Sequence, residues 1–217
     1  MLTDDLTKPL AHLDWNDTDA VQEASSPLLD HLAHDPERLG QLLAAVPDDP
    51  ALSALAEHYD ILDKVVLHHD PAGWRLRLHL FLPGYFDRPH NHRWTYSSRI
   101  LTGSYRHTLY GLDHQLDDHI DVATLHPYMV RTETTGSAYT LHHAMIHAAV
   151  AEPHTVTLIV RGPAMKDRFV VTDRTTNTVW WQYGAANESP AEAQNKRMDT
   201  ARFTDLHSTL TQLSLIT

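Results

Sequence analysis

The chain contains no cysteine. Disulfide bonds, thiolate metal ligands and a cysteine nucleophile are therefore excluded. The chain also has no apolar run near the roughly 20 residues that a membrane-spanning helix needs. Its first residues, MLTDDLTKPLAHLDW, lack the apolar core of a secretory signal peptide. These absences predict a soluble, cytoplasmic protein with no membrane partner.

Positive charge is scarce as well. Lysine and arginine number 17 against 28 aspartates and glutamates, which gives a net charge of -11 with histidine neutral. Such a surface repels phosphate backbones, so we expect no nucleic-acid partner. Dinucleotide-binding, Walker A and G-x-S-x-G motifs are also missing. These observations leave a small molecule as the expected partner.

What the chain has in excess is histidine, with 18 in its 217 residues. Three of them, His90, His92 and His147, lie in two blocks that glycines delimit. Residues two apart in a strand point the same way, so His90 and His92 can share one face. His147, from a distant strand, can complete a metal site with one side open, as catalytic metals require. His143 is a competing ligand if residues 143–147 are helical, but the β-type alternation there favours a strand.

The hydrophobic pattern changes along the chain. Residues 1–62 are expected to be helical, with starts at Ser26-Pro27, Asp35-Pro36 and Asp49-Pro50. Alternation from Trp74 to Leu82 indicates a strand, and further strand-like runs are 94–101, 104–110, 126–132, 137–143, 155–161, 168–172 and 178–183. Ser189-Pro190 begins a helical tail. Closely spaced strands favour an antiparallel sandwich or barrel.

The two histidine blocks resemble the two motifs of the cupin superfamily. The first motif, G-x5-H-x-H-x3-E-x6-G, matches at Gly84, His90, His92 and Gly103, with Tyr96 in place of the glutamate. The second motif, G-x5-P-x-G-x2-H-x3-N, matches at Gly136 and His147, with His142, Ala144 and Ala151 at its other positions. The resemblance implies a mostly-β, double-stranded β-helix (jelly-roll) fold. We expect a helical N-terminal cap at 1–62, a cupin barrel at 63–185 and a helical tail at 186–217.

The loss of the glutamate leaves three neutral histidines as the expected ligands. Three-histidine cupins resemble thiol dioxygenases and some dioxygenases that cleave carbon–carbon bonds. The resemblance implies Fe(II), O₂ and a small anionic amino acid, thiol or organic acid, with no dependence on 2-oxoglutarate. It also makes a homodimer plausible. Three imidazoles suit Zn, Ni, Cu or Mn as well, so a metal-dependent hydrolase or isomerase and a non-catalytic ligand-binding cupin remain alternatives.

For residues beyond the three ligands, alternation along a strand indicates which side chains share a face. Tyr96 has the parity of His92 and is expected to contact substrate or to pack inside the barrel. Arg77 and His79 share one strand face, which could line the pocket or face solvent. Arg161 is a further candidate for binding a substrate anion. Arg75 shares the strand face of Arg77 and His79, and Lys64 is a candidate comparable to Arg161. Tyr105 and His107 share a face of the strand after Gly103, and either could line the barrel.

Overall fold

The computed structural model describes residues 2–86, 88–115, 121–184 and 189–217. Its α-helices are α1 (Asp4–Ala11), α2 (Thr18–Ala33), α3 (Pro36–Ala44), α4 (Pro50–Ser53), α5 (Pro190–Asn195) and α6 (Thr200–Gln212). Its strands are β1 (Glu57–Tyr59), β2 (Leu62–His69), β3 (Arg75–Phe81), β4 (Tyr96–Thr102), β5 (Ser104–Leu112), β6 (Met129–Thr134), β7 (Ala138–Leu141), β8 (Met145–Ala151), β9 (Val156–Arg161), β10 (Arg168–Asp173) and β11 (Thr178–Tyr183).

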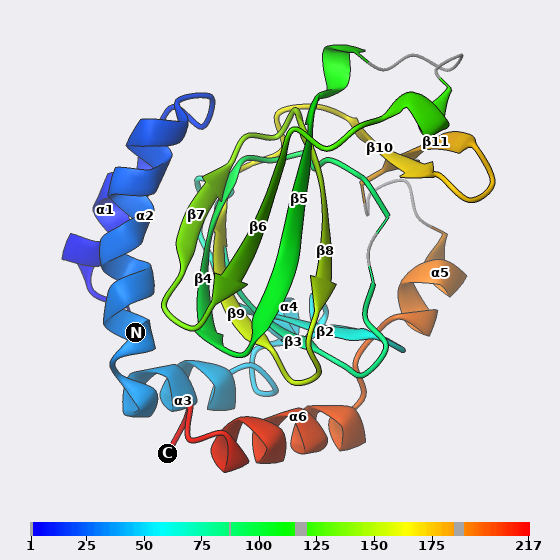
Figure 1. Cartoon of the computed structure of the whole chain (residues 1–217). Helices are drawn as coiled ribbons and strands as arrows, with labels where there is room; N and C mark the ends of the chain where they lie inside the picture. Colours follow the sequence, from blue (N-terminus) through cyan, green and yellow to red (C-terminus); the bar gives the residue numbers. More distant parts are fainter. Residues whose placement is uncertain (1, 87, 116–120, 185–188) are drawn as a thin grey trace.

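The strands form antiparallel sheets. A six-stranded sheet has the order β1-β2-β3-β9-β4-β7, and a three-stranded sheet has the order β6-β5-β8. Figure 1 shows β5, β6 and β8 in front of the larger sheet, with the hairpin β10-β11 at one end of the barrel. The mostly-β jelly-roll architecture predicted from the two motifs is confirmed.

The helices cover the outer face of the larger sheet. α2 packs on β4, β7 and β9, and α1 lies beside α2 (Figure 1). The even-numbered leucines of β3 belong to the same buried core as Leu28, Leu29 and Leu32 of α2. This core holds the helices to the sheet, and it fixes which face of each strand points away from the barrel interior.

Inside the barrel, the space between the sheets is apolar in one region. Both sheets contribute to a second core that contains Leu62, Phe81, Ile100, Tyr105, Ala149 and Ala151.

Gly103 joins β4 to β5 with φ +82°, a conformation that favours glycine. A Cβ at this position would lie 2.7 Å from the Cα atom of Thr155. The glycine is therefore required both by its backbone conformation and by the close approach of the neighbouring chain.

Two expectations about the helices were wrong. Pro27 lies inside α2, which begins nine residues earlier at Thr18 with Asp17 as its N-cap. The hydroxyl of Ser26 donates to the backbone oxygen of Gln22 at 2.7 Å, so its side chain bonds within the helix instead of capping a new one. The second error concerns Glu57–Tyr59, which form strand β1 paired with β2 where a helix was expected. The other Pro-marked starts, at Asp35, Asp49 and Ser189, are confirmed.

Among the described residues, no helix combines the length and the hydropathy needed to cross a bilayer.

Candidate metal centre

The three predicted ligands come together in the structure. The nearest ligand atoms of His90, His92 and His147 all lie within 4.8 Å of one another. Backbone hydrogen bonds explain the meeting of His90 and His147. Each of these residues donates its N–H to the other's carbonyl oxygen at 2.8 Å, which forms an antiparallel bridge between the 88–92 segment and β8. β8 is a strand, so the helical pairing with His143 does not occur.

Asn91 orients the two neighbouring histidines. It is fully buried, and its side chain donates to Asp113 at 2.8 Å and accepts from the backbone N–H of Val170 at 2.9 Å. Because successive residues of an extended segment point to opposite sides, anchoring Asn91 on one side turns His90 and His92 to the other. Their ring centroids lie 4.7 Å apart.

Hydrogen bonding determines the tautomer of His90. Its Nδ1 lies 2.8 Å from the carbonyl oxygen of Arg88, which can only accept a hydrogen bond. Nδ1 therefore carries the proton, and the lone pair is on Nε2, the form in which imidazole binds a metal. The Nε2 atoms of His92 and His147 lie 2.8 Å apart. Ring nitrogens from separate segments are thus gathered at one place, and we conclude that these residues fit a metal ion.

A buried histidine and a buried carboxylate lie behind His147. Nε2 of His107 is 2.9 Å from Nδ1 of His147, and Nδ1 of His107 is 3.6 Å from Oε1 of Glu133. With the His107 proton on Nδ1, facing Glu133, the Nε2 atom of His107 accepts the Nδ1–H of His147. The Nε2 atom of His147 is then available to a metal ion. Nε of Arg131 forms an ion pair with the same Glu133 oxygen at 3.1 Å. We refer to Glu133, His107 and His147 as the relay.

The environment keeps these histidines neutral. Burial lowers the pKa of His92 and of His147 well below the ordinary value, and the nearby imidazole of His90 lowers both further. A neutral imidazole is the form that a metal ion requires. Burial therefore holds His92 and His147 in the protonation state that can ligate a metal ion.

Tyr96 occupies the position where the motif has glutamate. It is buried, its ring centroid lies 5.0 Å from that of His92, and it bonds Tyr139. It adds no carboxylate to the histidine group. His143 is outside the group, and its ring nitrogen lies 3.3 Å from the hydroxyl of Thr95.

The strand face that carries Arg77 and His79 points between the sheets, because the alternating leucines of β3 face the helices. Arg161, on the adjacent strand β9, is buried, and its Cα pairs with that of Arg75. Lys64 pairs with His79 across β2 and β3, and its ammonium lies 4.6 Å from the ring centroid of Tyr59. The sequence left open whether the strand face of Arg77 and His79 lines the pocket or faces solvent, and the structure turns this face to the barrel interior.

The relay was only half anticipated. His107 was among the weaker candidates because it shares a strand face with Tyr105, whereas Glu133 was missed. A single acid in a strand carries little information without its partner, and this partner lies 26 residues away. The available signal was that Glu133 is the only carboxylate in the run Met129–Thr134.

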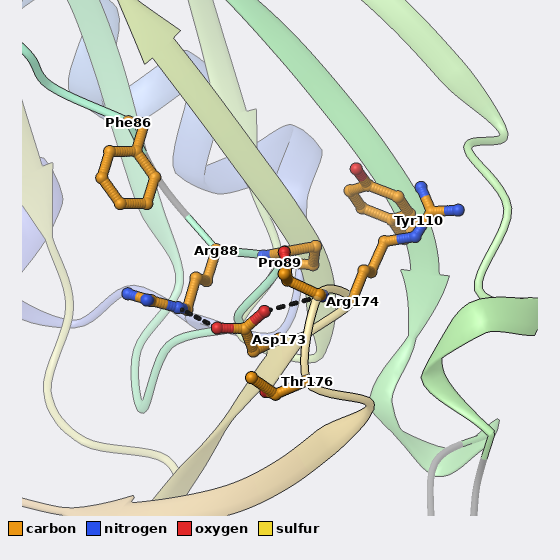
Figure 2. A pocket seen from close by; sticks show the side chains of 8 residues that line it. Phe86, Arg88, Pro89, Tyr110, Asp173, Arg174 and Thr176 are labelled. Carbon is orange, nitrogen blue, oxygen red and sulfur yellow. Dashed lines mark hydrogen bonds and ion pairs between the residues drawn. The ribbon is translucent and has the colours of Figure 1, made fainter.

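A surface hollow of about 490 Å³ lies next to the segment that carries His90. Figure 2 shows Arg88 and Asp173 on its wall, and the Arg88 Nε–H donates to Asp173 at 2.8 Å. Since the Arg88 carbonyl oxygen also fixes the ring of His90, this ion pair anchors the metal-site segment to the β10-β11 hairpin.

No family model matches the sequence, and no curated protein matches it. Solved structures do resemble it. One is KdgF from Halomonas sp., with 20% identity and a TM-score of 0.39 over 50% of this chain and 86% of that chain. Another is an RmlC-like cupin from Shewanella frigidimarina, with 17% identity and a TM-score of 0.38 over 51% and 85%. A third is ectoine synthase from P. lautus, with 12% identity and a TM-score of 0.43 over 68% and 92%. Because one fold hosts many chemistries, none of these activities is transferred to this chain.

Proposed function

We propose that this protein is a cytoplasmic, mononuclear non-haem iron dioxygenase that oxidises a small anionic substrate with O₂ and without 2-oxoglutarate. The observation that carries the proposal is the convergence of His90, His92 and His147, with burial lowering the pKa of His92 and of His147. When bound, ferrous iron would supply redox chemistry toward O₂ and a positive centre for the substrate.

The neutral donor set explains the expected charge of the substrate. Three imidazoles leave the full +2 charge of a divalent ion uncompensated, whereas a two-histidine, one-carboxylate set compensates one unit. With Tyr96 in place of a carboxylate, the site favours an anion such as a thiolate, enolate or hydroxy acid. The site is less suited to binding 2-oxoglutarate, because enzymes that depend on this co-substrate commonly hold their metal with the carboxylate-containing set.

Other side chains are assigned to substrate handling. Tyr96 would present its hydroxyl beside His92 as a hydrogen-bond donor to substrate, held in place through its bond to Tyr139. Burial raises the pKa of Tyr139, so this phenol stays protonated. Arg77, Arg161 and His79 would position the substrate anion from β3 and β9.

Oxygen consumption tests the proposal. Purified protein reconstituted with Fe²⁺ is offered thiols, amino acids and hydroxy acids in an oxygen electrode, and we expect substrate-dependent uptake from at least one class. His147→Ala should abolish uptake. His142→Ala, a nearby histidine outside the metal group, should retain it.

Two results would contradict the proposal. One is oxygen uptake that persists in His147→Ala. The other is turnover of a substrate with Zn²⁺ or Ni²⁺ and no uptake of oxygen, which would identify a metal-dependent hydrolase or isomerase instead. Stabilisation by a ligand with no product under either metal would indicate a binding protein.

A further inference from the structure

Two arginines lie against one tryptophan inside the barrel, and a third lies beside them on the same sheet. Arg75 and Arg77 lie on β3, Arg161 lies on β9, and we call these three the arginine cluster. The guanidinium carbons of Arg77 and Arg161 lie 5.3 and 4.9 Å from the ring centroid of Trp94. The tryptophan ring provides a flat surface against which planar guanidinium groups stack, which leaves their N–H edges free for a ligand.

Within the described residues, the cluster has little negative charge to match its own. The charged neighbours that act on Arg161 are Arg77, Arg75 and Arg93, all positive. The carboxylate that acts on Arg75 and Arg77 is Glu57, and it already forms an ion pair with Lys196 at 3.1 Å. Burial lowers the pKa of Arg77 to about 10 and that of Arg161 to about 8, with the other arginines adding to the shift. Guanidinium groups are rarely buried together without anions, because each desolvated charge needs compensation.

Hydrogen-bonding capacity in the cluster is also unused. The Nε atoms of Arg75, Arg77 and Arg161 are buried and have no hydrogen-bond partner within the described residues. Arg161 does donate from one terminal nitrogen to the carbonyl oxygens of Gly162 and Gly73, at 2.6 and 3.4 Å. These bonds fix the position of the group and leave its Nε–H unsatisfied. A buried donor without an acceptor is costly, so a missing acceptor is indicated.

The cluster adjoins the metal centre. The Trp94 ring is stacked with that of His92 at 5.9 Å between centroids, and Tyr96 pairs with Arg161 through their Cα atoms. Trp94 therefore contacts both His92 and two members of the arginine cluster, so the cluster and the histidine group are neighbours. A ligand of a few carbon atoms could contact both.

We propose that the arginine cluster is the recognition site for an oxyanion group carrying two negative charges, such as a phosphate or a pair of carboxylates, at the end of the substrate distal to the metal. One carboxylate would leave most of the cluster's charge uncompensated, whereas a dianion offers several oxygens to the free N–H edges. Naming the bound anion as part of a substrate rests on the proposed function. The binding of the anion itself does not.

The test measures anion binding in the absence of metal. Chelated wild-type protein and chelated His147→Ala protein are titrated with phosphate, sulfate and malonate against chloride at constant ionic strength. Thermal denaturation and calorimetry follow the binding. We expect a dianion to raise the Tm by roughly 4 °C or more at saturation, equally in both proteins. A larger response to phosphate and sulfate indicates a phosphoryl or sulfonyl group, and a larger response to malonate indicates a dicarboxylic acid.

Arg77→Gln and Arg161→Gln should each weaken anion binding at least tenfold. Arg106→Gln, which changes an exposed arginine of β5, should leave it within twofold. Removing one of three mutually repelling charges should also leave the anion-free Tm unchanged or higher, whereas the loss of a structural arginine would lower it. The proposal is overturned if no dianion is more stabilising than chloride, or if the arginine-cluster variants respond like wild type. Neither result bears on metal-dependent oxygen uptake, so the two proposals fail separately.

Discussion

His107 is predicted to control metal affinity without touching the metal. Its imidazole accepts the Nδ1–H of His147 at 2.9 Å and is itself oriented by Glu133. Replacing it with leucine removes the acceptor and leaves the buried Nδ1–H of His147 unpaired. The ring can then rotate or adopt the tautomer that places the proton on Nε2. Either change removes a ligand for part of the time.

The size of the effect follows from the role of partners behind metal ligands. Losing such a partner typically costs 10- to 100-fold in metal affinity, which is about 1.4–2.8 kcal/mol. We expect His107→Leu to fall within this range. Glu133→Gln, which keeps the shape but weakens the orientation of His107, should give a smaller loss.

The assay is competition between the metal-free protein and a chelator for Zn²⁺ and for Fe²⁺. His68→Leu is the matched control, since His68 is a partly buried strand histidine whose ring centroid lies 4.8 Å from that of Trp74, outside the histidine group. The reasoning is refuted if His107→Leu folds and binds both ions within twofold of wild type, or if the control loses as much affinity.

Two predictions concern stability. Gly103→Ala should cost at least about 2 kcal/mol in urea unfolding, because the positive φ and the approach of Thr155 add together; an unchanged midpoint would contradict this. In chelated protein the Tm should fall as the pH drops below about 6.5, since burial holds the pKa of His79 and of His68 below the ordinary value. The unfolded chain then takes up protons that the folded chain does not, so stability present above that pH is lost below it. A Tm that is flat or rising from pH 7.5 to 5.5 would show that the buried histidines do not control stability.

The sequence predicted the three-histidine group because the spacing of its members reflects local geometry. Alternation places His90 and His92 on one side of an extended segment, and the delimiting glycines mark where the chain turns. The ends of the strands on either side of Gly103 were predicted to within two residues, whereas β2 and β8 were not among the predicted runs. Glu57–Tyr59 was missed because three residues are too few to show a period, and their pairing with β2 is a tertiary effect.

The charged interior could not be predicted from the sequence alone. The alternation of leucine and arginine in β3 says that the two faces differ, but not which face the helices cover. The packing of α2 on the large sheet decides this, and it turns Arg77 inward. The relay depended on pairing between β5, β6 and β8, which local sequence does not encode. Long-range strand order therefore determined the parts of the site that motif spacing could not.

The most direct test of the central claim is the metal content of untagged protein, expressed with iron supplied and purified without a nickel column. We predict about one metal ion per chain in wild type and in His142→Ala, and almost none in His147→Ala. Wild-type protein without bound metal, or His147→Ala protein with an undiminished metal content, would contradict the assignment of His90, His92 and His147 as a metal centre.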